Sequence, residues 1–126
     1  MPTALFIAAG ALLGASGVLL GAMGAHGLES RLGADALESW RTAVLYQLVH
    51  ALALVAVGVL LRVDLPRRWL AVSGYSFILG ALLFCGALYA LALGAPRGLA
   101  HFAPVGGVAF VVGWLGMLTA ALRGRD

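Results

Sequence analysis

Four long stretches without a single Asp, Glu, Lys or Arg constrain this sequence more than any other feature. An α-helix needs about 20 predominantly apolar residues to cross a bilayer, and each stretch is long enough. They cover residues 2–28, 42–61, 69–96 and 98–122. None of them shows the strict alternation of polar and apolar residues that marks the strands of a membrane β-barrel. Trimmed at their Gly and Pro residues, the stretches predict transmembrane helices near residues 3–24, 36–61, 68–93 and 104–123.

The composition indicates the same class of protein. Hydrophobic residues make up 63% of the chain and charged residues 10%, and the mean hydropathy is +1.04. Ordinary soluble domains are about 45–50% apolar and about 25% charged. A soluble fold of 126 residues has too little interior to hide so much apolar surface. We therefore expect an all-α membrane protein, a four-transmembrane-helix bundle with short loops that forms a single domain over residues 1–126.

The basic residues are all Arg and lie at the edges of the apolar stretches. A formal net charge of +3 would suggest nucleic acid in a soluble protein, but Arg at the ends of spans sets topology, so no nucleic-acid partner is expected. The side that holds residues 62–68 and the C-terminus has five Arg, against three on the other side. Cytoplasmic loops carry the excess of basic residues. We therefore predict a multi-pass protein of the inner or plasma membrane with both termini in the cytoplasm.

Small residues recur along two of the predicted helices at the spacing of a contact face. Lipid gives helices little hydrophobic reason to associate, so small residues that permit close backbone approach mark the faces that pack. The helix-packing residues predicted on this basis are Gly10, Gly14, Gly17, Gly21 and Gly24 in the first helix and Gly106, Ala109, Gly113, Gly116 and Ala120 in the last. Such contacts can lie within one chain or between subunits. A cofactor groove lined by glycine is the alternative interpretation.

Polar side chains inside apolar spans are functional hypotheses, because their burial is costly. His50 lies 12 residues before Arg62, about 18 Å from the cytoplasmic boundary and in the outer half of the bilayer. Tyr46 and Gln47 precede His50 by four and three residues and share its helix face. Polar residues of the other helices are expected at a similar depth. The candidate polar cluster consists of His26, Tyr46, Gln47, His50, Cys85, Tyr89 and His101.

Two interpretations of the candidate polar cluster are open. His26, His50 and His101 could bind zinc or copper, two of them could ligate haem, and a proton or quinone site is a further option. Alternatively, each histidine hydrogen-bonds a backbone carbonyl or a neighbouring hydroxyl and closes a kink or a helix end. The sequence has no H-x-x-x-H spacing and no CxxCH motif, so we expect no metal site and no other cofactor. For His50 we expect a partner on another helix.

Four blocks of the sequence carry a family resemblance. They are GAMGAHGL at 21–28, WRTAVLYQLVHALAL at 40–54, FILGALLFCGALYALAL at 77–93 and PVGGVAFVVGW at 104–114. In order and spacing they resemble the YgdD family, small bacterial inner-membrane proteins with relatives in animals. The resemblance implies a polytopic membrane protein with a domain of unknown function. It supplies no catalytic residues, although the positions that match overlap the candidate polar cluster.

The sequence favours a protein that is not an enzyme. It contains no nucleophile–base pair, phosphate-binding loop, dinucleotide-binding glycine motif or pair of carboxylates. We expect a structural or accessory subunit of a membrane complex, or a small self-associating bundle, with the lipid bilayer and other membrane subunits or further copies as partners. A haem, metal or quinone site on the three histidines is one alternative. A small transporter is another, although the spans lack the charged residues that transport sites use.

Overall fold

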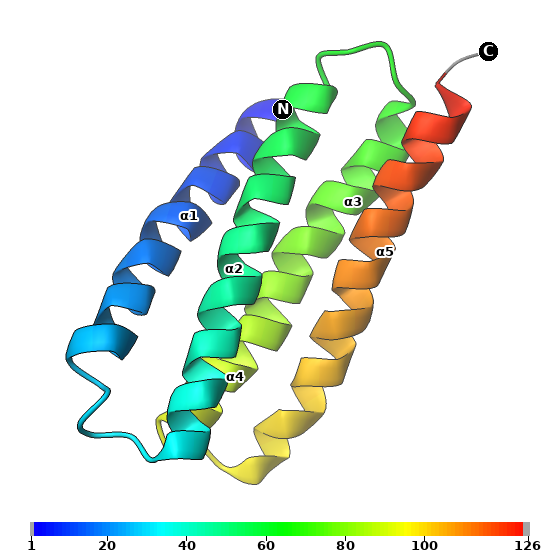
Figure 1. Ribbon diagram of the computed structural model, residues 1–126. Coiled ribbons are helices and arrows are strands. Elements are labelled where there is room, and N and C mark those ends of the chain that lie inside the picture. Colours follow the sequence, from blue (N-terminus) through cyan, green and yellow to red (C-terminus); the bar gives the residue numbers. More distant parts are fainter. Residues whose placement is uncertain (1, 125–126) are drawn as a thin grey trace.

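The computed structural model describes residues 2–124 as four helical rods, so the expected all-α, four-span architecture is confirmed (Figure 1). All four rods are long and apolar enough to cross a bilayer. The first two are α1 (Pro2–His26) and α2 (Ala34–Leu60). The third consists of α3 (Arg67–Gly80), the π-helical turn η1 (Ala81–Cys85) and α4 (Gly86–Ala92). The fourth consists of the 3₁₀ turn η2 (Arg97–His101) and α5 (Phe102–Arg123).

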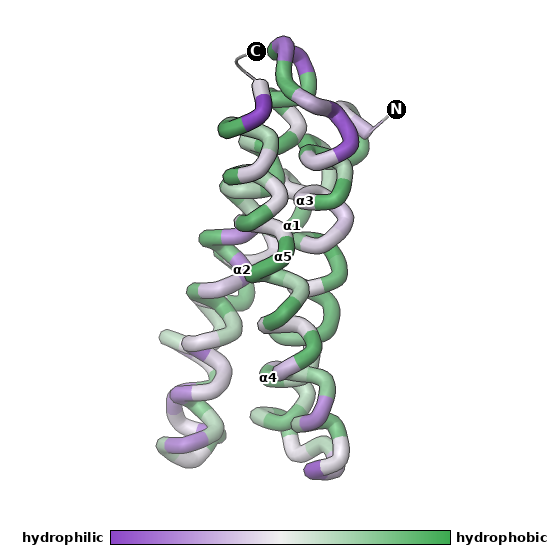
Figure 2. Tube along the Cα trace, turned by 90° about the vertical axis from the view of Figure 1, so that its right-hand side faces the viewer, coloured by the Kyte–Doolittle hydropathy of each residue, from purple (hydrophilic) through white to green (hydrophobic). Residues whose placement is uncertain are grey.

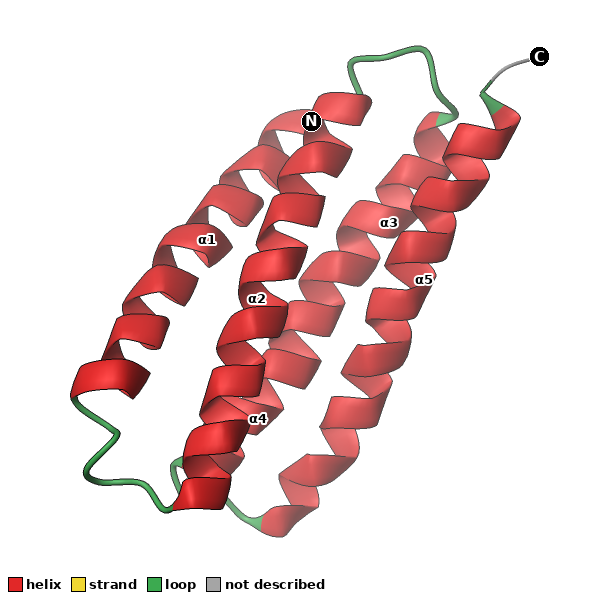
Figure 3. Ribbon diagram, in the orientation of Figure 1, coloured by secondary structure: helices red, strands yellow, loops and turns green. Residues whose placement is uncertain are grey.

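Short loops connect the rods (Figure 3). The start of α1, the loop 61–66 and the end of α5 lie at one end of the bundle (Figure 1). The loops 27–33 and 93–96 lie at the opposite end, which we call the distal end. Gly94 ends the third rod with a φ of 97°, a left-handed conformation that glycine adopts without strain. Next to it, Ala95 N donates to Ala90 O at 3.0 Å and so satisfies a carbonyl of the last helical turn.

The rods pack as two pairs. α1 lies along α2, α5 lies along α3 and η1, and α2 joins the pairs through its contacts with the third rod. α1 therefore has one main neighbour and sits at the edge of the bundle (Figure 1). Hydrophilic residues gather toward the two ends of the bundle (Figure 2). Between the ends the outward surface is apolar: Leu12 is 70% exposed, Leu19 66% and Leu52 75%, as suits side chains in contact with lipid.

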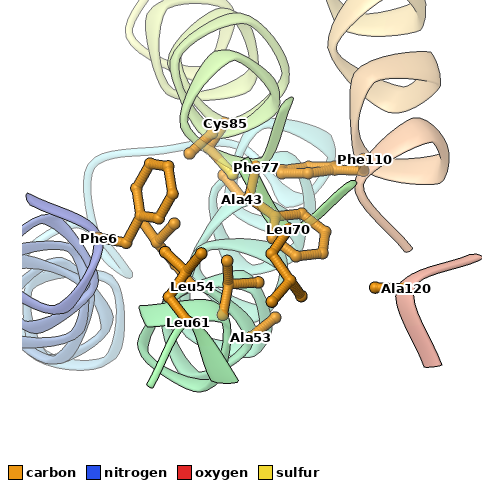
Figure 4. Close-up of a cluster of buried hydrophobic side chains, with 12 residues drawn as sticks. Phe6, Ala43, Ala53, Leu54, Leu61, Leu70, Phe77, Cys85, Phe110 and Ala120 are labelled. Carbon is orange, nitrogen blue, oxygen red and sulfur yellow. The ribbon is translucent and has the colours of Figure 1, made fainter. Parts of the chain in front are cut away.

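A cluster of buried apolar side chains joins all four rods (Figure 4). Phe6 of α1 reaches α3, where its ring occupies the space that a side chain at Gly74 would need. Leu54 of α2 and Phe77 of α3 are fully buried in the same cluster, and Phe110 adds a ring from α5. This packing fixes the rotation of each rod about its axis. It thereby determines which polar side chains of neighbouring rods face one another.

The helices differ from the expected boundaries in several details. α1 ends at His26, two residues later than expected. α2 begins at Ala34, two residues early, because Gly33 takes the N-cap position in an extended conformation and its carbonyl accepts from Leu37 N at 2.9 Å. The fourth rod begins at residue 97 rather than 104, since the turn η2 precedes α5. The third rod is interrupted by η1, where hydrogen bonds skip one residue further than in an α-helix and shift the side chains that follow.

Candidate functional site

Gln47 is the polar residue that joins the largest number of rods. It is only 4% exposed, and its side-chain amide reaches from α2 to two neighbours. Nε2 donates to Leu13 O and to Ser16 Oγ, both in α1 and both at 2.9 Å. Oε1 accepts from the hydroxyl of Tyr89 in α4 at 2.7 Å. The amide nitrogen and oxygen both have partners, and three rods are tied together at one level of the bundle.

His50 faces α5 and not the other histidines. Its Nδ1 lies 2.7 Å from Tyr46 O, one turn back in α2, and its Nε2 lies 3.1 Å from the indole nitrogen of Trp114 in α5. A carbonyl oxygen only accepts and an indole N–H only donates, so the two partners place the imidazole proton on Nδ1. The expectation that His50 points into the bundle and meets a group of another helix is confirmed. The ring links α2 to α5.

Aromatic rings surround the His50 imidazole. Phe110 of α5 stacks on it, with 3.7 Å between ring centroids and 13° between ring planes. The centroids of Phe77 and Trp114 lie 5.6 and 5.8 Å from that of the imidazole. These side chains fill the space between α2 and α5, whose backbones make little direct contact. They leave the imidazole 5% exposed.

Two further donors reach backbone carbonyls of neighbouring rods. Trp40 Nε1 donates to Leu20 O of α1 at 2.8 Å. The Ser73 hydroxyl is fully buried in α3 and lies 2.7 Å from Gly113 O of α5. With the bonds of Gln47 and His50, these contacts link α1 to α2, α2 to the third rod, α2 to α5 and the third rod to α5. We call the bonds from Trp40, Gln47, His50 and Ser73 the interhelical ties.

Glycines of the predicted contact face in α1 uncover the carbonyls that two of these donors reach. A helical side chain covers the turn before its own Cα, so it shields the carbonyl about four residues earlier. Gly17 and Gly24 each stand four residues after the carbonyl that accepts the donor. A Cβ on Gly17 would lie 3.4 Å from Gln47 Nε2, and one on Gly24 would lie 3.0 Å from Trp40 Nε1. The two glycines therefore serve both close packing and access to a hydrogen-bond acceptor.

The other predicted packing residues also lie against neighbours within this chain. Gly10 is buried against α2, where a Cβ would come within 2.6 Å of Val55 Cγ2, whereas Gly14 and Gly21 lie at the margin of that contact. Ala109 and Ala120 are buried. The glycines of α5 face the third rod: Gly106 lies against Phe84, Gly113 against Phe77 and Gly116 against Ser73.

The structure separates the three histidines. His26 and His101 are exposed at the distal end, and His101 lines a pocket there with Asp35. His50 follows Asp35 by 15 residues of one continuous helix, which is about 22 Å. Within residues 2–124 no three His, Cys, Asp or Glu side chains gather to hold a metal ion, and Cys85 is buried in the apolar core. A site built on all three histidines is therefore wrong, because two of them belong to the ends of helices.

Four side chains of the interhelical ties were not among the predicted site residues: Ser16, Trp40, Ser73 and Trp114. Ser16 and Ser73 stand inside apolar spans directly before a glycine, where a hydroxyl commonly bonds across helices, and this spacing was the available signal. Trp114 stands inside the fourth apolar stretch. Its indole N–H needs a partner in an apolar environment, and His50 Nε2 accepts from it at 3.1 Å.

Comparison with known proteins identifies the family. Residues 20–107, more than half of the chain, match the family model described as "Protein of unknown function (DUF423)". The chain belongs to the DUF423 family. No solved structure matches it. The description of the DUF423 family assigns no activity, so the function has to be argued from the geometry.

Relatives of the chain are named as membrane proteins. A UPF0382 membrane protein of Staphylococcus saprophyticus is 38% identical over 120 residues, which are 94% of this chain and 98% of the relative. The UPF0382 membrane protein YwdK of Bacillus subtilis is 36% identical over 119 residues, 94% of this chain and 97% of the relative. The UPF0382 inner membrane protein YgdD of Escherichia coli is 40% identical over 103 residues, 79% and 76% of the two chains. These matches confirm the resemblance to the YgdD family, and this DUF423 chain is a membrane protein.

Proposed function

We propose that this protein works without catalysis, through association within the membrane, either with further copies of itself or as an accessory subunit of a larger membrane complex. The proposal rests on a row of small, exposed residues on α1. Besides the glycines that face α2, this helix has a second row of small residues that faces away from the bundle. We call it the alanine stripe, and its members are Ala4, Ala8, Ala11, Ala15, Ala22 and Ala25, all exposed.

The alanine stripe has the spacing of a helix-contact face. Successive members are three, four or seven residues apart, so they lie along one side of α1. Each glycine that faces α2 is followed in the sequence by a position on this outward side. One residue corresponds to a rotation of about 100° around the helix axis, so the alanine stripe and the glycine face are separate sides of α1. Small residues at such spacing let a second helix approach closely. Contact with lipid alone does not require them, since lipid tails are as apolar as leucine.

An apolar groove runs beside the alanine stripe, between α1 and α2. Its volume is about 430 Å³, and Ala11, Gly14 and Leu52 are among the residues that line it. At Gly14 a Cβ would meet a single neighbour within 4 Å, Ala51 Cβ at 4.0 Å. Side chains of an approaching helix would therefore find a depression to fill next to the stripe, and packing of this kind is what drives helix association in lipid.

The state of the interior polar groups supports a role without catalysis. A general base or a ligand atom has to be within hydrogen-bond reach of a substrate. Both ring nitrogens of His50 already have partners, and so do both polar atoms of the Gln47 amide. These side chains are used to hold the rods together.

The test replaces alanines of the alanine stripe with the larger leucine and compares them with the same substitution on another helix. Ala11→Leu and Ala15→Leu should reduce the fraction of the protein in oligomers or complexes, measured by light scattering after mild-detergent extraction from its own membrane. Ala121→Leu, an equally exposed site on α5, is the control and should change nothing. Because the stripe faces outward, all three variants should keep the melting temperature of the isolated chain. An exclusively monomeric wild type, or equal association in all variants, would refute the proposal.

A further inference from the structure

The distal end of the bundle contains a pocket that the interhelical ties do not use. Its volume is about 530 Å³. The first turns of α2 supply Asp35 and Ser39, and η2 supplies Arg97 and His101. The remaining lining comes from small and apolar residues, including Leu91 at the end of α4. The pocket thus combines charged groups of both signs with an apolar wall.

The charged groups of this pocket are available to a ligand. Asp35, Arg97 and His101 are exposed. Within residues 2–124 the side-chain hydrogen bonds all involve other residues, so none of these groups, nor Ser39, is engaged by a neighbouring side chain or carbonyl. An acid and a base that face one pocket at the end of a bundle favour a molecule that carries both charges. A simple anion would be opposed by Asp35, and a simple cation by Arg97.

We propose that this pocket binds the headgroup of a zwitterionic phospholipid that carries a primary ammonium group, as phosphatidylethanolamine does. The ammonium would donate to the Asp35 carboxylate, and the phosphate would accept from the Arg97 guanidinium and the His101 imidazole. Arg recognises phosphate through its fork of N–H donors, and His adds a further donor. Ser39 adds a hydroxyl to the lining of the same pocket.

The position of the pocket in the membrane selects a lipid over a soluble zwitterion. Asp35 lies in the first turn of a transmembrane helix and Arg97 just before another, which is the depth of lipid headgroups. Leu91 and its neighbour Ala92 continue the wall from the charged mouth toward the hydrocarbon region. A ligand that is polar at one end and apolar at the other satisfies both parts of this wall.

The lining also distinguishes a primary from a quaternary ammonium. Quaternary ammonium groups cannot donate hydrogen bonds, and proteins recognise them with aromatic rings. No Phe, Tyr or Trp side chain lines the pocket among the residues that the structure describes. A carboxylate such as that of Asp35 accepts hydrogen bonds from a primary ammonium and gains little from a quaternary one beyond its charge.

The experiment titrates the full-length protein in detergent with three lipids of identical acyl chains and follows bound lipid by native mass spectrometry. Phosphatidylethanolamine should bind more tightly than phosphatidylglycerol, which lacks the ammonium, and than phosphatidylcholine, which is quaternary. Asp35→Asn should weaken phosphatidylethanolamine about fivefold, the change that corresponds to a partly exposed ion pair, and should not weaken phosphatidylglycerol. Arg97→Gln should weaken both.

Control variants change charged residues at the opposite end of the bundle, and a further variant changes the size of the pocket without changing its charge. Asp64→Asn and Arg62→Gln, exposed residues of the loop 61–66, should leave all three affinities unchanged. Ala95→Leu narrows the pocket without changing charge and should weaken phosphatidylethanolamine even if a charge variant folds poorly. Equal binding of the three lipids by the wild type, or unchanged selectivity in Asp35→Asn, would overturn the proposal. Binding of free phosphoethanolamine as tight as that of the lipid would also overturn it, since the ligand would then be a soluble zwitterion.

Discussion

Replacing Gln47 with Leu tests the interhelical ties at the residue that takes part in three of them. Leu has a similar size but cannot hydrogen-bond, so the variant loses the two bonds to α1 and the bond from Tyr89. Hydrogen bonds between transmembrane helices measure about 0.6 kcal/mol on average, so three of them give about 2 kcal/mol. Ser16 Oγ keeps its bond to Leu12 O at 2.8 Å, and the Tyr89 hydroxyl loses its partner.

The orphaned hydroxyl makes this prediction specific. Tyr89→Phe should lower the free energy of unfolding by about 0.6 kcal/mol in the wild type. In the Gln47→Leu background the same change should cost nothing or stabilise the protein, because it removes a hydroxyl that has no partner. The measurement is equilibrium unfolding in mixed micelles with increasing dodecyl sulfate, followed by circular dichroism, as a double-mutant cycle. Wild-type stability of Gln47→Leu, or effects of the two changes that simply add, would refute the reasoning.

Three further predictions concern a second tie, a packing glycine and topology. His50→Leu should lower the free energy of unfolding by about 1–2 kcal/mol, since it removes the bond from Trp114, the bond to Tyr46 O and the stacking on Phe110. His26→Leu at the exposed end of α1 should have little effect in the same assay, and equal effects would contradict the assignment. Gly17→Leu should lower the melting temperature in detergent, because even a Cβ there would lie 2.7 Å from Leu48 Cδ2, and an unchanged melting curve would speak against the close contact. A Cys introduced at Ser30, in the loop 27–33, should react with a membrane-impermeant thiol reagent in intact cells if both termini are cytoplasmic, and reaction only after permeabilisation would reverse that topology.

The helices could be predicted from the sequence because the bilayer imposes one requirement on every span. Apolar stretches of sufficient length mark the four rods, and charged residues in the loops or directly next to them separate the stretches. Two boundaries were displaced by local backbone effects, the extended N-cap at Gly33 and the 3₁₀ turn before α5. The turn η1 has no sequence mark of its own, and Phe84 within it lies against Gly106 of α5.

The sequence indicated which residues belong to the site better than it indicated which of them form hydrogen bonds with one another. Burial cost alone pointed to Gln47, His50 and Tyr89, and the structure engages all three in hydrogen bonds. Which groups pair depends on the rotation of each rod, and the core sets that rotation. The predicted convergence of the three histidines failed for a different reason. Depth along a span can be read from residue numbers, but His26 and His101 lie at helix ends where depth estimates no longer apply.

Photo-crosslinking from the alanine stripe in native membranes is the most direct test of the proposed role in association. A photoreactive amino acid would replace Ala15 on α1 and, in the control, Ala121 on α5, both of which are exposed. Association through α1 predicts a protein adduct from position 15, either with a second copy or with another membrane protein, and none from position 121. Adducts with lipid alone from position 15, or equal protein adducts from both positions, would contradict the claim that α1 carries the contact face.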